Sequence, residues 1–215
     1  MINDKRSILQ LPKLILASGS PRRAEILNFV GWEFEKHVAD IDETEFANEK
    51  PEDYVRRLAK TKAETVAENY ENALVLGADT IVVIDNQIIG KPKDLPDARR
   101  MLRLLSGNWH EVFTGVALVK KENPKSKTQN LKSVVGLQKT RVKFAALSDA
   151  EIELLIEKGE PLDKAGAYAV QAQAALFIEE IQGDYWNVVG LPVNLVYKMA
   201  KDFSDGRAKK NRTAD

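Results

Sequence analysis

Two serines and two arginines are concentrated in one short segment, Ser18-Gly-Ser-Pro-Arg-Arg23. Ser20 suits the N-cap position of a helix and Pro21 its first turn, so the apolar run before residue 18 would end at a helix N-terminus. The unpaired backbone N–H groups and the helix dipole attract anions there. Because a first turn favours acidic residues, Arg22 and Arg23 would cost about 0.5–1 kcal/mol unless an anion faced them. The segment therefore predicts a phosphate site rather than an ordinary capped surface helix.

Two charged residues interrupt patterns that are otherwise apolar. Asp79 lies inside the segment 73–84, where a buried carboxylate is costly unless it is paired or metal-bound. It is therefore either a structural acid that holds a neighbouring loop or part of a site, and Gly77 is expected to leave room for a ligand on the same face. Lys62 interrupts the apolar stripe of an expected helix, where it either passes the edge of the core or reaches into a cleft.

Further charges lie in two expected loops. Lys91 precedes Pro92, which stiffens the chain and fixes the direction of the ammonium group. Asp42 and Glu43 belong to an acidic segment that is either solvated or able to ligate a metal. Carboxylates together with phosphate oxygens form a Mg²⁺ or Mn²⁺ site, because hard cations prefer oxygen ligands. The arginines and lysines would then offset the charge of a polyphosphate.

Other nucleotide and metal motifs are missing from the sequence. It contains no glycine-rich loop that ends in Lys-Ser or Lys-Thr, so it is not a P-loop protein. His37 and His110 do not have the spacing of metal ligands, and we interpret both as structural or surface residues.

The elements that must position these side chains alternate between strands and helices, which predicts an α/β fold. Strands are expected from Leu14 to the break at Gly19 and over 73–84, 87–90, 111–119, 133–144 and 174–181. Helices are expected to begin at Pro21, Pro51, Asp94 or Pro96, Ser148 and Pro192, and the last is expected to end near Phe203. We expect residues 120–130 to form a hairpin loop.

Composition excludes several classes of function. The 215 residues include 32 basic and 32 acidic side chains, so nothing favours a nucleic-acid polymer or an anionic membrane as partner. The absence of cysteine excludes thiol catalysis and disulfides and fits a cytoplasmic protein. The N-terminus lacks the apolar core of a signal peptide. We expect an N-terminal extension over 1–11, a single domain over 12–203 and a disordered tail over 204–215.

Taken together and in order, six motifs of this chain resemble the Maf family of nucleoside triphosphate pyrophosphatases. They are Ser18-Gly-Ser-Pro-Arg-Arg23, Gly77-Ala-Asp-Thr80, Lys91-Pro92, Leu105-Ser-Gly107, Asp163-Lys-Ala-Gly-Ala-Tyr168 with Gln171, and Val188-Val-Gly-Leu-Pro192. The resemblance covers about residues 12–203. It implies a mixed central sheet flanked by helices, with two lobes around a long cleft as in inosine-triphosphate pyrophosphatases. It also implies a homodimer.

The resemblance further implies hydrolysis of a nucleoside triphosphate between its α and β phosphates, with a divalent metal, Mg²⁺ or Mn²⁺. Asp79 matches the general base of the family, and Glu43 and Asp79 match its metal site. The residues that match phosphate ligands are Ser18, Ser20, Arg22, Arg23, Lys62 and Lys91.

Three positions assign a substrate branch within this resemblance. Arg22, Thr80 and Gln171 match the branch that acts on dTTP and UTP, and a glutamine side chain can pair with the carbonyl and N–H edge of a pyrimidine. The branch that resembles 7-methyl-GTP pyrophosphatases has Gln after the aspartate and Glu in place of this glutamine. The alternatives are therefore a pyrophosphatase for 7-methyl-GTP or another modified nucleotide, and a nucleotide-binding regulator of cell division and septum formation.

Overall fold

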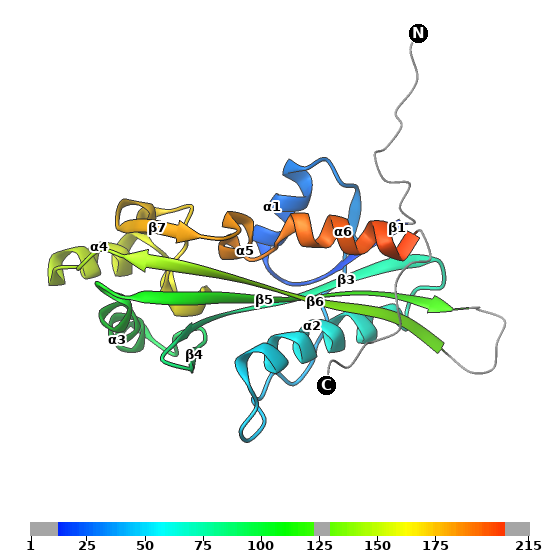
Figure 1. Cartoon of the computed structure of the whole chain (residues 1–215), viewed down its shortest axis with the longest axis horizontal. Helices are drawn as coiled ribbons and strands as arrows, with labels where there is room; N and C mark the ends of the chain where they lie inside the picture. The colour runs from blue at the N-terminus through cyan, green and yellow to red at the C-terminus, as the bar shows by residue number, and fades with distance from the viewer. Residues whose placement is uncertain (1–12, 123–129, 205–215) are drawn as a thin grey trace, which may run out of the picture.

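The computed structural model describes residues 13–122 and 130–204 of the chain. Its centre is a seven-stranded sheet in the order β2-β1-β3-β5-β6-β7, with β4 paired to β3 (Figure 1). β1 runs parallel to β2 and β3, and the other pairs are antiparallel, so the expected mixed α/β fold is confirmed. The strands are β1 Lys13–Ala17, β2 Phe34–Lys36, β3 Ala73–Ile84, β4 Gln87–Ile89, β5 Trp109–Glu122, β6 Asn130–Phe144 and β7 Ile178–Gln182.

Helices cover both faces of this sheet. The α-helix α2 packs along β3 and β5 on one face, and α1, α5 and α6 lie on the other (Figure 1). Among the described residues, no helix has both the length and the apolar character needed to cross a bilayer. The helices are α1 Pro21–Phe29, α2 Pro51–Ala67, α3 Leu95–Leu105, α4 Asp149–Lys158, α5 Tyr185–Val189 and α6 Val193–Ser204, and short 3₁₀ turns occupy Pro161–Asp163, Ala165–Ala167 and Gln173–Leu176.

The core lies on both sides of the central strands. In β1, Leu14 and Leu16 point into the larger apolar cluster, whereas Ile15 and Ala17 point into the cluster under α2. Nearly every residue of β3 is buried, as expected for a strand covered on both faces. A carboxylate on β3, such as that of Asp79, must therefore find its partners within the protein or in a ligand.

Two glycines determine how closely α2 approaches the sheet. A Cβ atom at Gly77 of β3 would lie 2.2 Å from the carbonyl oxygen of Ala59, and one at Gly115 of β5 would lie 2.2 Å from that of Val55. Both carbonyls belong to α2, so any larger residue would push this helix outward. The expectation that Gly77 makes room for a ligand was therefore wrong, because it makes room for α2.

Most expected helix boundaries are confirmed. Ser148 forms a capping box with Glu151, and the Asp94 side chain caps α3 by accepting a hydrogen bond from the backbone of Asp97. Ser20 occupies the N-cap position of α1, but its side chain makes no capping hydrogen bond. Here the side chain of the preceding serine, Ser18, accepts a hydrogen bond of 3.2 Å from the Ser20 backbone.

Other expectations were wrong or incomplete. The strand expected from residue 174 begins only at Ile178, because Gln173–Leu176 forms a 3₁₀ turn. β5 continues to Glu122 and so enters the expected hairpin loop. The short elements β2 and α5 were not predicted. The rest of that loop, the N-terminal extension and the tail beyond residue 204 lie outside the described residues.

Candidate active site

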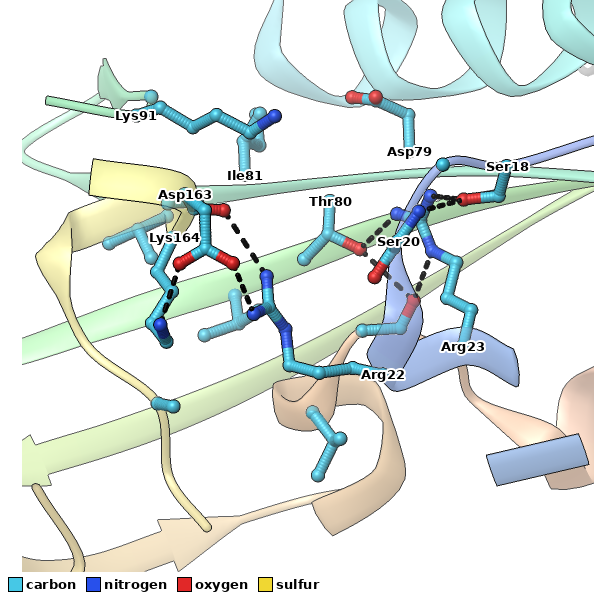
Figure 2. A pocket seen from close by; sticks show the side chains of 18 of the residues that line it. Ser18, Ser20, Arg22, Arg23, Asp79, Thr80, Ile81, Lys91, Asp163 and Lys164 are labelled. Carbon is cyan, nitrogen blue, oxygen red and sulfur yellow. Dashed lines mark hydrogen bonds and ion pairs between the residues drawn. The ribbon is translucent and has the colours of Figure 1, made fainter. Parts of the chain in front are cut away.

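A cavity of about 540 Å³ opens where the turn between β1 and α1 meets the middle of β3. The segment after β4, the loop over 163–171 and the link between α5 and α6 complete its walls (Figure 2). Every residue that the family resemblance assigned to the site lines this cavity: Ser18, Ser20, Arg22, Arg23, Glu43, Lys62, Asp79, Thr80, Lys91 and Gln171. The structure therefore brings together residues that are as far apart in the chain as positions 18 and 171.

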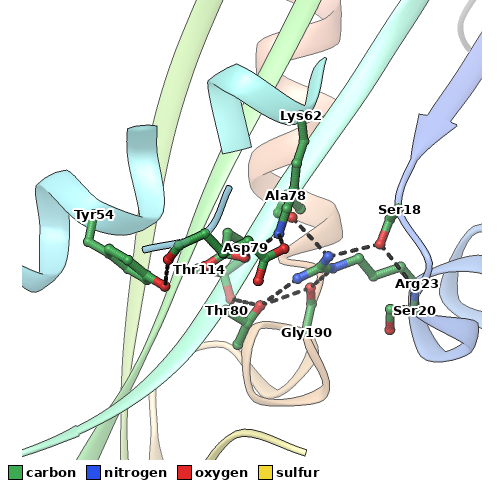
Figure 3. Close-up of polar contacts among 11 residues, drawn as sticks. Ser18, Ser20, Arg23, Tyr54, Lys62, Ala78, Asp79, Thr80, Thr114 and Gly190 are labelled. Carbon is green, nitrogen blue, oxygen red and sulfur yellow. Dashed lines mark hydrogen bonds and ion pairs between the residues drawn. The ribbon is translucent and has the colours of Figure 1, made fainter. Parts of the chain in front are cut away.

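The centre of the cavity contains a buried ion pair. Lys62 on α2 and Asp79 on β3 are only 9% and 7% exposed, and Nζ of Lys62 lies 2.6 Å from Oδ1 of Asp79 (Figure 3). The same ammonium group lies 2.7 Å from Oε1 of Glu43. Burial raises the pKa of the Asp79 carboxyl, although the positive charges of Lys62 and Arg23 oppose this. Lys62 thus reaches into the cleft and joins the two carboxylates that the sequence assigned to a metal.

Several contacts with α2 hold the loop that carries Glu43. Arg57 binds the carboxylate of Glu49 through Nε and Nη2, each at 2.6 Å, and Nη2 also donates to the carbonyl of Thr44 at 3.0 Å. The hydroxyl of Tyr54 donates to the backbone carbonyl of Glu43 at 2.9 Å. These contacts hold the backbone at Glu43 and in the residues that follow it.

The neighbouring acid, Asp42, has a different position. Its Oδ1 accepts hydrogen bonds from the backbone and the hydroxyl of Thr44, and these bonds lower the pKa of the carboxyl. Asp42 is exposed and does not line the cavity. Of the two acidic candidates, only Glu43 belongs to the site.

Arg23 is buried and most of its donors bind the protein. Nε donates to the carbonyl of Gly190 at 2.9 Å, and Nη1 donates to Oγ of Ser18 at 2.9 Å and to the carbonyl of Ala78 at 2.8 Å. Nη2 donates to Oγ1 of Thr80 at 3.1 Å (Figure 3). Burial lowers the pKa of Arg23, against the opposing charge of Asp79. This guanidinium group therefore joins the start of α1 to β3 and to the end of α5.

Arg22 extends in the other direction, toward the loop after α4 (Figure 2). Its Nη1 lies 2.9 Å from Oδ2 of Asp163, and its Nη2 donates to the backbone carbonyl of the same residue at 3.2 Å. The motif around Asp163 was recognised in the sequence, but no role was assigned to its carboxylate. A charge in a loop gives no signal of a partner 141 positions away.

Thr80 is held by a neighbour that the sequence did not identify. Its Oγ1 lies 2.9 Å from Oγ1 of Thr114, which is fully buried and lies opposite Thr80 in the pairing of β3 with β5.

Two other candidates, Lys91 and Gln171, have side chains that no described residue of the protein holds. Both are exposed to the cavity, and within the described part of the chain neither side chain has a hydrogen-bond partner.

The two histidines have structural positions, as expected. His37 lies 3.1 Å from the hydroxyl of Tyr70. His110 is buried behind the cavity wall, where its Nε2 lies 2.8 Å from the hydroxyl of Tyr168 and its Nδ1 has no partner within the described residues. Burial lowers the pKa of His110 to about 4, so the imidazole is neutral near pH 7.

The donor set of the cavity fits a hard divalent cation. Among the described residues, no group of three or more acidic, histidine or cysteine side chains forms a complete metal cage. Asp79 and Glu43 instead offer two carboxylates that converge on one point, now bridged by Lys62. Mg²⁺ is usually held by one or two carboxylates and completes its shell with water and substrate phosphates.

The chain is similar to known proteins over most of its length. Residues 13–203 match the family described as Maf-like protein. The chain is 48% identical over 196 residues to a dTTP/UTP pyrophosphatase of Bacillus cytotoxicus, which covers 91% of this chain and 98% of that protein. A dTTP/UTP pyrophosphatase of Bacillus mycoides is 47% identical over 191 residues, covering 89% and 95%. A solved HAM1 protein from Coxiella burnetii is 16% identical, with a TM-score of 0.48 over 90% of this chain and 98% of its own. The chain belongs to the Maf family.

Proposed function

We propose that this protein is a nucleoside triphosphate pyrophosphatase that hydrolyses dTTP and UTP to the monophosphate and pyrophosphate. Relatives with this printed name match nearly the whole chain at 47–48% identity. The observation that carries the proposal is the cavity itself, in which a buried carboxylate, Asp79, lies among cationic side chains near the N-terminus of α1. An elongated polyanion is the ligand whose charge this arrangement complements.

The triphosphate would bind along the start of α1. Backbone N–H groups at this helix end and the hydroxyls of Ser18 and Ser20 offer hydrogen bonds to phosphate oxygens, and Arg22 and Lys91 offer charge. The Lys91 ammonium is available to a ligand because no described residue pairs with it. The buried side chains of Arg23 and Lys62 add positive potential to the cavity. Their hydrogen bonds also hold two residues in place: Arg23 donates to Thr80, and Lys62 donates to Asp79.

Asp79 is our candidate general base. Its burial raises its pKa, and a carboxylate with a raised pKa accepts a proton more readily than an exposed one. It would orient and deprotonate a water molecule for in-line attack on the α-phosphorus, and the bond from this phosphorus to the bridging oxygen would break as pyrophosphate leaves. Lys62 would keep the carboxylate ionised until it takes the proton.

A divalent cation, Mg²⁺ or Mn²⁺, would be held by Asp79 and Glu43 together with phosphate oxygens. When bound there, it supplies Lewis-acid polarisation and lowers the pKa of a coordinated water. The contacts of Tyr54 and Arg57 with the loop support the position of Glu43, which is the more exposed of the two carboxylates.

The base of the nucleotide would be selected by Arg22, Thr80 and Gln171. Gln171 carries one donor and one acceptor group, which matches the carbonyl and N–H edge of thymine or uracil. A site built for one edge rejects other bases because its polar groups would be left unpaired. We further propose a single domain over 12–203, a homodimer and a cytoplasmic location.

The test is a panel of triphosphates with Mg²⁺ or Mn²⁺, scored for both products. We expect dTTP and UTP to give stoichiometric monophosphate and pyrophosphate. Preferential turnover of 7-methyl-GTP would replace the proposed substrate with the alternative branch. Tight binding of a triphosphate without turnover would favour a nucleotide-binding regulator.

A further inference from the structure

The carboxylate of Asp163 is shared between two cations from different parts of the cavity wall. Its Oδ2 lies 2.9 Å from Nη1 of Arg22, at the start of α1, and its Oδ1 accepts from Nζ of Lys164 at 2.6 Å (Figure 2). Burial raises the pKa of the Asp163 carboxyl, but the hydrogen bonds from these two cations outweigh burial and hold the pKa below its ordinary value. Asp163 is therefore an anion at neutral pH.

The protein fixes this carboxylate from behind. Lys164 is buried, and its ammonium group also donates to the carbonyl of Glu160 at 2.5 Å. The next turn is attached to the end of β4, because the backbone N–H of Gly166 donates to the carbonyl of Gly90 at 3.0 Å. Gly166 adopts φ +70° there, and a Cβ atom would lie 2.9 Å from Cγ2 of Val82. Asp163 thus belongs to a segment packed against β3 and held at both sides.

These contacts determine what Arg22 can offer to a ligand. Two of its terminal nitrogens are bound to Asp163, one to the carboxylate and one to the backbone carbonyl, so the plane of the guanidinium group is set. An arginine carries five N–H donors, so others remain for a ligand in the cavity that Arg22 lines. Part of its charge is already compensated, so its remaining donors can pair with a neutral carbonyl acceptor as well as with a phosphate.

We infer that Asp163 is a positioning residue for substrate selection: it orients Arg22 so that the guanidinium group reads the C4 carbonyl of the pyrimidine base. This inference rests on the proposed pyrophosphatase function and extends it. An anion at this place would repel phosphates, so it also directs the phosphate chain away from the Asp163 carboxylate. Asp163 acts through Arg22 and does not touch the reacting atoms.

The experiment compares kcat/KM for dTTP and dCTP in wild type, Asp163→Asn, Arg22→Gln and the double variant. Thymine and cytosine share the C2 carbonyl, but C4 carries a carbonyl in thymine and an amino group in cytosine, and thymine also has a C5 methyl group. The phosphates are identical, so the ratio reports selection of the base rather than of the phosphates. Because the Asp163 side chain is 54% exposed, we expect a modest effect, a three- to tenfold loss of the dTTP preference, roughly the range for a partly solvated ion pair. In the Arg22→Gln background, Asp163→Asn should change the ratio no further.

Asp149→Asn is the matched control, since this carboxylate also lies 2.9 Å from an arginine, Arg103, but far from the cavity. It should leave the ratio unchanged, and thermal unfolding should show all variants folded. An equal change for dTTP and dCTP, or a full additional effect of Asp163→Asn in the Arg22→Gln background, would overturn the inference while leaving the pyrophosphatase intact. A wild-type protein that hydrolyses no triphosphate would overturn both.

Discussion

Replacing Lys62 by methionine, which has a similar shape and no charge, would leave the Asp79 carboxylate buried without its ion-pair partner. The two groups are 2.6 Å apart and both side chains are 11% exposed. At an effective dielectric constant of about 20, unit charges at this separation attract each other by about 6 kcal/mol before desolvation is subtracted. Breaking a buried pair costs about 3–5 kcal/mol, and because Arg23 still opposes the charge of Asp79 we expect the lower value, about 3 kcal/mol.

Urea denaturation at pH 8 would measure the free energy of unfolding of the wild type, Lys62→Met and the double variant with Asp79→Asn. The double variant should recover most of the lost stability, because it removes the uncompensated charge. Lys60→Met is the control on the same helix, since its ammonium group lies 3.7 Å from Glu64 and is 40% exposed, and it should lose less than about 0.5 kcal/mol. A double variant no more stable than Lys62→Met would show that the unpaired charge of Asp79 is not the cause of the loss.

Three further predictions concern stability and substrate choice. Burial lowers the pKa of His110 to about 4, so only the unfolded chain takes up a proton as the pH falls below about 6.5. Urea denaturation should therefore show that, between pH 8 and pH 5, the free energy of unfolding falls by about 2 kcal/mol more in the wild type than in His110→Gln. Gly77→Ala places a Cβ atom against the backbone of α2, so we expect it to lower the free energy of unfolding by about 3 kcal/mol and to slow pyrophosphate release. Gly90→Ala is the control: its Cβ atom meets no atom within 4 Å, so the free energy of unfolding should be nearly unchanged. Gln171→Glu should lower kcat/KM for dTTP at least about tenfold with an unchanged urea midpoint, because the residue is exposed, and an unaltered substrate profile would exclude Gln171 from base selection.

Local signals in the sequence were sufficient to predict most elements and the location of the site. Capping residues, the apolar run of β3 and the stripe of α2 depend on neighbours within a few positions, and so the starts of α2 and α4 were predictable. A charge inside an apolar pattern was also a reliable signal, because Asp79 and Lys62 each proved to be the partner of the other.

Features that depend on tertiary partners could not be predicted in this way. Gly77 was assigned to the ligand because the sequence does not show which helix will pack against a strand. Thr114 looks like an ordinary β-branched strand residue until the register places it opposite Thr80. The pairing of Arg22 with Asp163 likewise depends on a contact between segments that are distant in the chain.

Hydrolysis of dTTP in water enriched in ¹⁸O would test attack on the α-phosphorus, because the label reports which phosphorus the water attacks. With the wild type, we expect one labelled oxygen in the monophosphate and none in pyrophosphate, and Asp79→Asn should lower kcat at least about 100-fold. Label in pyrophosphate or in inorganic phosphate, or an Asp79→Asn variant as fast as the wild type, would contradict the account.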